Sequence, residues 1–218
     1  MKTKLKMALL SGACLAMAAS AQAQNYVNGD LLVGFTGGGT DFIYDLGQFS
    51  SLSVGQTWNI GSGLGAKFGV VGAQSTGKHI YATSFDSTEN SFDPTALYNT
   101  ASANIRTISG QPTALTIGTS RTPGPGDTTS WTYQTDQPPG TPGNTFENNF
   151  FDPNVNVGSP AYFFDNPNTG GVTSQNAWFT YDSANGVLSY VPEPTAGCLL
   201  GGGSLLILGL RRQGKHAA

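Results

Sequence analysis

The chain has few of the residues on which catalytic and cross-linking chemistry most often depends. Of its 218 residues, two are cysteines, two are histidines, and only 11% are charged. Because Cys14 and Cys198 lie near the two ends, residues 24–190 contain no cysteine, which excludes disulfides, thiolate metal ligands and thiol nucleophiles there. The same segment has one histidine, His79, which the surrounding pattern places at a strand end. We therefore predict no catalytic residue, no metal and no cofactor.

One kind of enzymatic activity remains possible. Aspartate and glutamate are scattered through the chain, so paired carboxylates for glycoside hydrolysis stay open, although no spacing singles out a pair. An exported hydrolase is accordingly the weakest of the functions considered.

Basic residues are also scarce in the middle of the chain. Residues 24–190 carry four of them (Lys67, Lys78, Arg106 and Arg121) against twelve acidic residues, a net charge of −8, whereas the whole chain carries −3. An acidic surface argues against nucleic acid and other anionic polymers as direct partners.

The first 23 residues have the order of a secretory signal peptide. A basic start, MKTKLK, precedes a short apolar segment and then Ala21-Gln22-Ala23, a small-residue cleavage site. The apolar segment is shorter than the ~20 residues of a spanning helix, which favours removal by signal peptidase after passage through the export translocon. Lipoprotein processing at Cys14 is an alternative, but Ser11 stands where a bacterial lipobox usually has leucine.

The last 28 residues, 191–218, contain three features in a fixed order. Pro192-Glu193-Pro194 comes first, an uncharged apolar segment over 195–210 follows, and Arg211 and Arg212 come next. At 1.5 Å per residue the apolar segment would extend about 24 Å, somewhat less than the ~30 Å hydrocarbon core, so it needs the flanking arginines at the headgroup level. The two prolines hold the preceding triplet extended, and the positive end predicts that the tail stays cytoplasmic. An ordinary single-pass anchor is the alternative.

This tail resembles the C-terminal sorting signal of bacterial PEP-CTERM proteins. The resemblance covers Val191 to about Lys215 and implies that Pro192, Glu193 and Pro194 form a recognition motif for a membrane-embedded exosortase. Proteins of this type usually come from Gram-negative bacteria that make exopolysaccharide. Residues 28–85, with GDLLVGFTGGGTDFIYDLG followed by FGVVG and HIYATSF, also resemble PEP-CTERM proteins of verrucomicrobial type, a group with no assigned activity.

Residues 24–190 have the pattern of a single β-rich domain, with short apolar runs between Gly, Ser, Thr and Asn. The predicted strands are 30–35, 42–46, 68–72, 79–85, 114–118, 161–164, 178–181 and 187–190. Asn185-Gly186 between the last two predicts a tight hairpin, and Gly37-Gly38-Gly39 is a hairpin loop instead of a phosphate loop. The predicted fold is an antiparallel β-sandwich, jelly-roll-like.

Two segments depart from the strand pattern. Asp93-Pro94 is a helix start, Ala96, Leu97, Ala101, Ile105 and Ile108 recur at helical spacing, and Gly110 ends the run, which predicts a helix near 94–108. Residues 121–144, rich in proline and glycine, predict a long irregular excursion.

The tryptophans suggest a binding function. Trp58, Trp131 and Trp178 are of the type that stacks on sugars, and Trp131 in the irregular excursion is the ring expected to be exposed and to contact a glycan. Trp178 is expected in the core. Asp152-Pro-Asn154-Val-Asn156 suggests a loose surface calcium site as an alternative to a plain turn, although an EF-hand match fails. We thus expect an exported surface or matrix-associated protein, with a carbohydrate-binding module for exopolysaccharide as the alternative.

Overall fold

The structure is a computed structural model of the chain, and it describes residues 27–87, 98–110, 115–124, 126–135, 152–167 and 173–192. These residues are mainly in strands. The strands are β1 Asp30–Thr36, β2 Phe42–Gln48, β3 Thr57–Asn59, β4 Lys67–Gln74, β5 His79–Ser84, β6 Ser120–Arg121, β7 Val155–Asn156, β8 Ala161–Pro167, β9 Thr173–Asp182 and β10 Val187–Pro192. The helices are α1 Tyr98–Ile108, α2 Trp131–Thr135 and the 3₁₀ turn η1 Phe49–Ser51.

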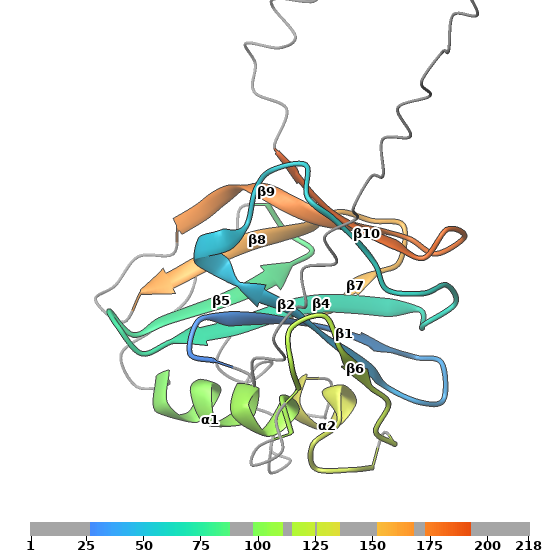
Figure 1. Cartoon of the computed structure of the whole chain (residues 1–218), viewed down its shortest axis with the longest axis horizontal. Coiled ribbons are helices and arrows are strands. Elements are labelled where there is room, and N and C mark those ends of the chain that lie inside the picture. The colour runs from blue at the N-terminus through green and yellow to red at the C-terminus, as the bar shows by residue number, and fades with distance from the viewer. Residues whose placement is uncertain are drawn as a thin grey trace, which may run out of the picture.

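All ten strands belong to one antiparallel sheet that curls on itself. The order is β3-β10-β9-β8-β5-β4-β1-β2-β6, and β7 pairs with β4 outside this path. Figure 1 shows β8, β9 and β10 lying over β1, β2, β4 and β5, with α1 and α2 on the opposite side of the latter strands. The prediction of a mainly β, antiparallel, sandwich-like fold is confirmed. The one predicted helix, near 94–108, corresponds to α1, and the short helix α2 was not predicted.

The space between the two halves of the sheet is filled by side chains that alternate along the strands. This inner core consists of Leu31, Val33, Phe35, Leu46, Ile60, Phe68, Val70, Tyr81, Val155, Ala161, Phe163, Ala177, Phe179, Tyr181, Leu188 and Tyr190. Rings from opposite halves meet inside it, since the centroids of Phe35 and Tyr181 lie 4.6 Å apart in an edge-to-face arrangement. Phe49 of η1 packs on Tyr81 at 4.4 Å and so covers part of this core.

The other face of β1, β2, β4 and β5 packs against the helices. This helix-side core consists of Leu32, Ile43, Val71, Ala73, Ile80, Ala82, Ala101, Ile105, Ile108, Leu115 and Trp131. Because both faces of β1 are covered, all seven of its residues are buried. Its middle, Leu31–Phe35, is a continuous apolar run without alternation.

Helix α1 agrees with the predicted periodicity. Ala101, Ile105 and Ile108 are its buried residues, at the i, i+4, i+7 spacing of one helix face. The helix ends at Ile108, and Gly110 adopts φ +85° and donates its N–H to the Thr107 carbonyl at 2.9 Å. The predicted start at Asp93-Pro94 lies outside the described residues.

The final hairpin, between β9 and β10, is also confirmed, but its turn differs from the predicted tight turn at Asn185-Gly186. Val187 pairs with Asp182, so four residues connect β9 and β10, and Gly186 takes φ +70°. Asn185 does not adopt positive φ; instead its N–H and side-chain amide both donate to the Asp182 carboxylate. The turn is therefore an Asx-stabilised one closed by a left-handed glycine.

Two predictions about irregular regions were wrong in part. The predicted strand 114–118 is a turn in its described residues, where Gly118 at φ +77° donates to the Asp45 carbonyl, and the strand that pairs with β2 is β6 at Ser120–Arg121. The excursion 121–144 begins with β6 and contains the short helix α2, while residues 136–144 lie outside the described part. Isolated short elements of this kind depend on tertiary contacts, which local sequence patterns do not encode.

Candidate functional site

Most residues of the predicted targeting segments lie outside the described part of the chain. This applies to Ala21, Ala23, Glu193, Pro194, Arg211 and Arg212. Pro192 is the exception, since it is the last residue of β10 and is exposed. Within the described residues, none of the helices has the length and hydrophobicity needed to cross a membrane.

Trp131 is not an exposed ring, so the prediction that it contacts a glycan was wrong. It is the first residue of α2, it has 0% of its surface exposed, and it packs in the helix-side core. Its indole Nε1 donates to the Asn154 side-chain oxygen at 2.6 Å. A buried indole needs such a partner, because an unpaired N–H away from water is costly.

Two glycines make room for this tryptophan. Gly34 of β1 and Gly69 of β4 are paired across the strands, and a Cβ atom on Gly34 would overlap the indole ring. A Cβ on Gly69 would come within 3.2 Å of the same ring and would overlap the Pro153 carbonyl. The ring thus lies directly on the sheet backbone, a close approach that only glycine permits.

The other two tryptophans are both half-buried. Trp58 packs on the rim of the inner core, 6.2 Å from the Phe179 ring. Trp178 was expected in the core, but Ala177 and Phe179 are the buried residues of that part of β9, so Trp178 lies on the opposite face. There its ring makes an edge-to-face contact with Tyr162 on β8, with ring centroids 6.0 Å apart.

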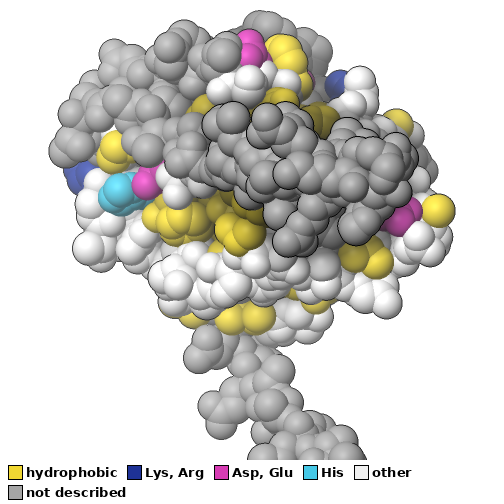
Figure 2. All heavy atoms as spheres, turned by 90° about the horizontal axis from the view of Figure 1, so that it is seen from above, with side chains coloured by type: hydrophobic (Ala, Val, Ile, Leu, Met, Phe, Trp, Pro, Cys, Tyr) yellow, Lys and Arg dark blue, Asp and Glu magenta, His cyan; other side chains and the backbone are white. Residues whose placement is uncertain are grey.

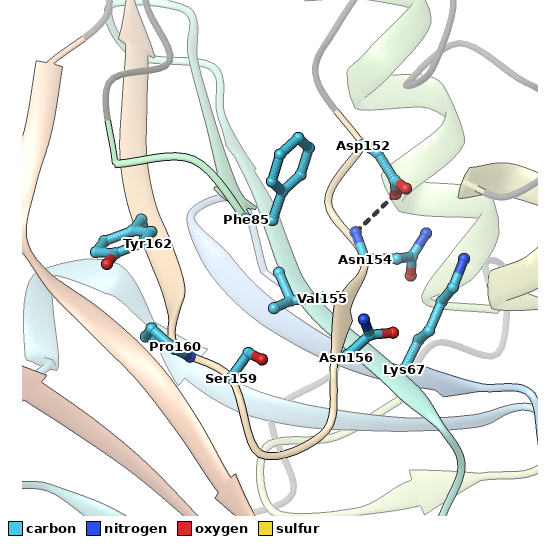
Figure 3. A pocket seen from close by; sticks show the side chains of 9 residues that line it. All are labelled: Lys67, Phe85, Asp152, Asn154, Val155, Asn156, Ser159, Pro160 and Tyr162. Atoms are coloured by element: carbon cyan, nitrogen blue, oxygen red, sulfur yellow. Dashed lines mark hydrogen bonds between the residues drawn. The ribbon is translucent and has the colours of Figure 1, made fainter.

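A pocket of about 460 Å³ lies where β4, β5, β7 and β8 come together. Its lining is Lys67, Phe85, Asp152, Asn154, Val155, Asn156, Ser159, Pro160 and Tyr162. Figure 3 shows Lys67, Asn154 and Asn156 on one side and Tyr162 on the other, with Phe85 and Val155 between them. Phe85 directly follows β5 and is 65% exposed, which is unusual for a large apolar side chain.

The segment that forms one wall of the pocket is held by contacts on both sides. Val155 and Asn156 pair with β4, and the Thr83 hydroxyl donates to the Pro153 carbonyl at 2.8 Å. The Asn154 amide group, besides accepting from Trp131, donates to the Thr135 hydroxyl at 3.2 Å. The pocket wall is therefore fixed by the buried tryptophan and α2, and its shape is formed without a ligand.

The same contacts weaken the calcium alternative for this segment. Asp152 accepts the Asn154 backbone N–H at 2.8 Å, as in an Asx turn, and both polar atoms of the Asn154 side chain are used inside the protein. Among the residues described, no three His, Cys, Asp or Glu side chains gather in a way that could hold a metal ion.

His79 begins β5, as predicted, and has one close partner that the sequence did not indicate. Its Nδ1 lies 2.7 Å from a carboxylate oxygen of Asp165 on the neighbouring strand β8. Gly77 lies near the other ring nitrogen, and a side chain at that position would clash with the imidazole, because an added Cβ would stand 2.5 Å from Nε2. In Figure 2 the histidine side chain lies against an acidic one, beside a group of hydrophobic side chains. The arrangement is a histidine–carboxylate pair at the surface.

Asp30 and Asp45 form an unusual buried pair of carboxyl groups. Both have 0% of their surface exposed, and Asp30 Oδ1 and Asp45 Oδ2 have no hydrogen-bond partner. Burial, together with the nearby Asp30 charge, raises the pKa of Asp45 to about 7, although its other oxygen accepts the Gly47 N–H at 2.8 Å. Burial raises the pKa of Asp30 as well. Burial thus disfavours the ionised form of both carboxyl groups in the folded state.

Comparison with known proteins provides no relative. No protein-family model, no curated protein and no solved structure matches this chain. The site therefore has to be interpreted from its own residues.

Proposed function

We propose that this is an exported bacterial protein of the cell surface or extracellular matrix, sorted by its C-terminal Pro192-Glu193-Pro194 motif. The observation that carries the proposal is the fixed order at the C-terminus of triplet, apolar segment and arginine pair, together with the signal peptide pattern over residues 1–23. The partners that follow are the export translocon, signal peptidase and an exosortase-like membrane enzyme.

The end of the last strand supports the role of the triplet. β10 pairs with β9 up to Pro192, which pairs with Ala177, so the motif begins at the final residue of the sheet. Since proline has no N–H to donate, Pro192 is a suitable residue to end a strand. A processing enzyme would therefore cut beyond the folded domain and leave both cores intact.

The described domain supports a binding or structural role over an enzymatic one. His79 is paired with Asp165. The buried Asp30 and Asp45 lie within the sheet beside the helix-side core, and none of these groups belongs to the pocket lining. These two sets of titratable groups thus do not converge on the pocket, as catalytic groups would.

The sorting proposal is tested by substitution of the motif in the native host. Glu193→Ala and Pro194→Ala are expected to keep the protein in the membrane fraction, whereas wild type appears at the cell surface or in the medium. Val54→Ala, at an exposed position of the domain, is the control and should behave like wild type. Equal distribution of all four proteins would contradict the proposal.

A further inference from the structure

We propose that the pocket between β4, β5, β7 and β8 binds an uncharged saccharide, with Phe85 and Tyr162 as the stacking rings and Asn156 and Ser159 as hydrogen-bonding groups. This site differs from the one that sequence patterns favoured, because Trp131 is buried beneath the pocket wall. It does not depend on how the C-terminus is processed.

The first argument is the chemistry of the lining. Five of the nine lining side chains are charged or polar, and the remainder includes two aromatic rings. Sugars combine hydroxyl groups with apolar C–H faces, and their binding sites accordingly combine amide or hydroxyl groups with flat rings. A purely apolar ligand would cover the exposed Asn156 amide and Ser159 hydroxyl without offering either of them a hydrogen bond.

The second argument is the position of Phe85. A phenyl ring that is 65% exposed at the mouth of a pocket contributes little to the fold, yet it offers a face to a ligand. Tyr162 comes from the adjacent strand, where its backbone pairs with Ser84, the residue before Phe85. The two rings therefore stand at one end of the same strand pair.

The third argument concerns charge and size. Lys67 and Asp152 contribute one charge of each sign, so the lining is balanced within a domain that is otherwise acidic. A negatively charged sugar would meet the repulsion of the acidic surface, and a neutral one would not. The volume of about 460 Å³ falls in the range of roughly 300–1,000 Å³ that small-molecule sites occupy.

The fourth argument is preorganisation. The wall residues Asp152–Asn156 are fixed by β4, by Thr83 and by the buried Trp131–Asn154 hydrogen bond. Asn156 and Ser159 are exposed, and a turn in which the Ser159 N–H donates to the Asn156 carbonyl at 3.0 Å holds them near each other. Little ordering entropy would then be lost on binding.

The test uses the full chain, purified in a zwitterionic detergent without a sugar headgroup, on an array of neutral and uronate-containing glycans. Hits are then titrated by calorimetry. Wild type is expected to bind a neutral glycan, and Phe85→Ala and Asn156→Ala are each expected to bind it roughly tenfold more weakly. Val54→Ala, which also removes an exposed apolar side chain, should bind like wild type.

Three outcomes would overturn the proposal. They are no binding to any neutral glycan, binding confined to uronate-containing glycans, and binding that Phe85→Ala and Asn156→Ala leave unchanged. Because both substituted residues are exposed, thermal unfolding curves of the variants should match that of wild type, which separates lost binding from lost folding.

Discussion

The inner core and the helix-side core are built from different kinds of side chains. The inner core is rich in rings: Phe35, Phe68 and Tyr181 contact one another, and Phe163 packs edge-to-face on Phe179. The helix-side core is mostly aliphatic with one large ring, Trp131, and buried polar groups lie within or beside it. These are Asp30, Asp41, Asp45, Ser109, Ser130, Gln134, Thr135 and Asn154.

This difference shows how each layer is fixed. Ring packing and alternation hold the two halves of the sheet together, and such contacts tolerate small adjustments. The short helix α2 is instead positioned by directed contacts: Asp41 accepts the N–H and hydroxyl of Thr132, and the Ser130 hydroxyl accepts the Tyr133 N–H at the start of the helix. The proposed saccharide pocket depends on this second layer, because Asn154 joins its wall to Trp131.

The largest expected effect comes from filling the space under the indole ring. Gly34→Ala places a methyl group where the Trp131 ring lies, so the ring and α2 must move. We expect a loss of about 3 kcal/mol in the free energy of unfolding, measured by urea denaturation with tryptophan fluorescence. Gly124→Ala, where nothing lies within 4 Å of the added atom, is the control and should change stability by less than about 0.5 kcal/mol. If the two variants were equally stable, the proposed difference between the inner core and the helix-side core would be contradicted.

The second effect concerns the buried carboxyl pair and pH. The folded-state pKa of Asp45, about 7, lies above its unfolded value near 3.8, so its stabilising contribution is full below pH 4 and is lost as the pH rises through 7. Between these two pH values the free energy of unfolding is expected to fall by a quantity on the order of 4 kcal/mol. Two neighbouring groups are coupled to Asp45. Burial also raises the pKa of Asp30, and burial together with the Asp45 charge raises the pKa of Tyr44.

Asp45→Asn should abolish most of this pH dependence. The amide oxygen can still accept the Gly47 N–H, and the amide group cannot ionise. Thermal unfolding at pH 5 and pH 8 is expected to show a stability difference in wild type that is much smaller in the variant, with the variant the more stable at pH 8. A variant with the same pH profile as wild type would show that the pair does not control it.

The smallest expected effect tests one directed hydrogen bond made by a ring of the inner core. The Tyr181 hydroxyl donates to the Gly61 carbonyl at 2.6 Å, and Tyr181→Phe removes this bond while keeping the ring contacts with Phe35 and Phe68. We expect a loss of about 1 kcal/mol in unfolding free energy by urea denaturation. Tyr162→Phe, at a half-buried position on the other face, should have less effect. A loss of several kcal/mol for Tyr181→Phe would mean that the inner core also depends on directed bonds.

The sequence predicted the features that depend on regular spacing. The strands at 30–35, 42–46, 68–72 and 79–85, the final hairpin and the buried face of α1 follow from period-2 and period-3.6 patterns. Which face of a strand is buried was harder to predict, because Trp178 and Phe179 are both large and the register decides between them.

Most of the candidate site could not be predicted from the sequence. Trp131 stands among proline, glycine and threonine. Nothing local indicates that Gly34 and Gly69, 97 and 62 residues earlier in the chain, form the surface on which it lies. The paired glycines within two apolar strands are the one signal of a close approach that sequence reasoning missed. The pocket combines residues of β4, β7 and β8 with Phe85, which follows β5, and such convergence appears only after folding.

The central claim, that the folded domain is delivered by terminal segments that are processed, is tested most directly by the intact mass of the protein from its native host. Both ends should be mapped by peptide sequencing. The account predicts an N-terminus at Gln24 and a C-terminus near Pro194, just beyond the last residue of β10. Recovery of the chain with residues up to Ala218 in the membrane fraction would contradict the sorting proposal and leave the tail as a plain anchor.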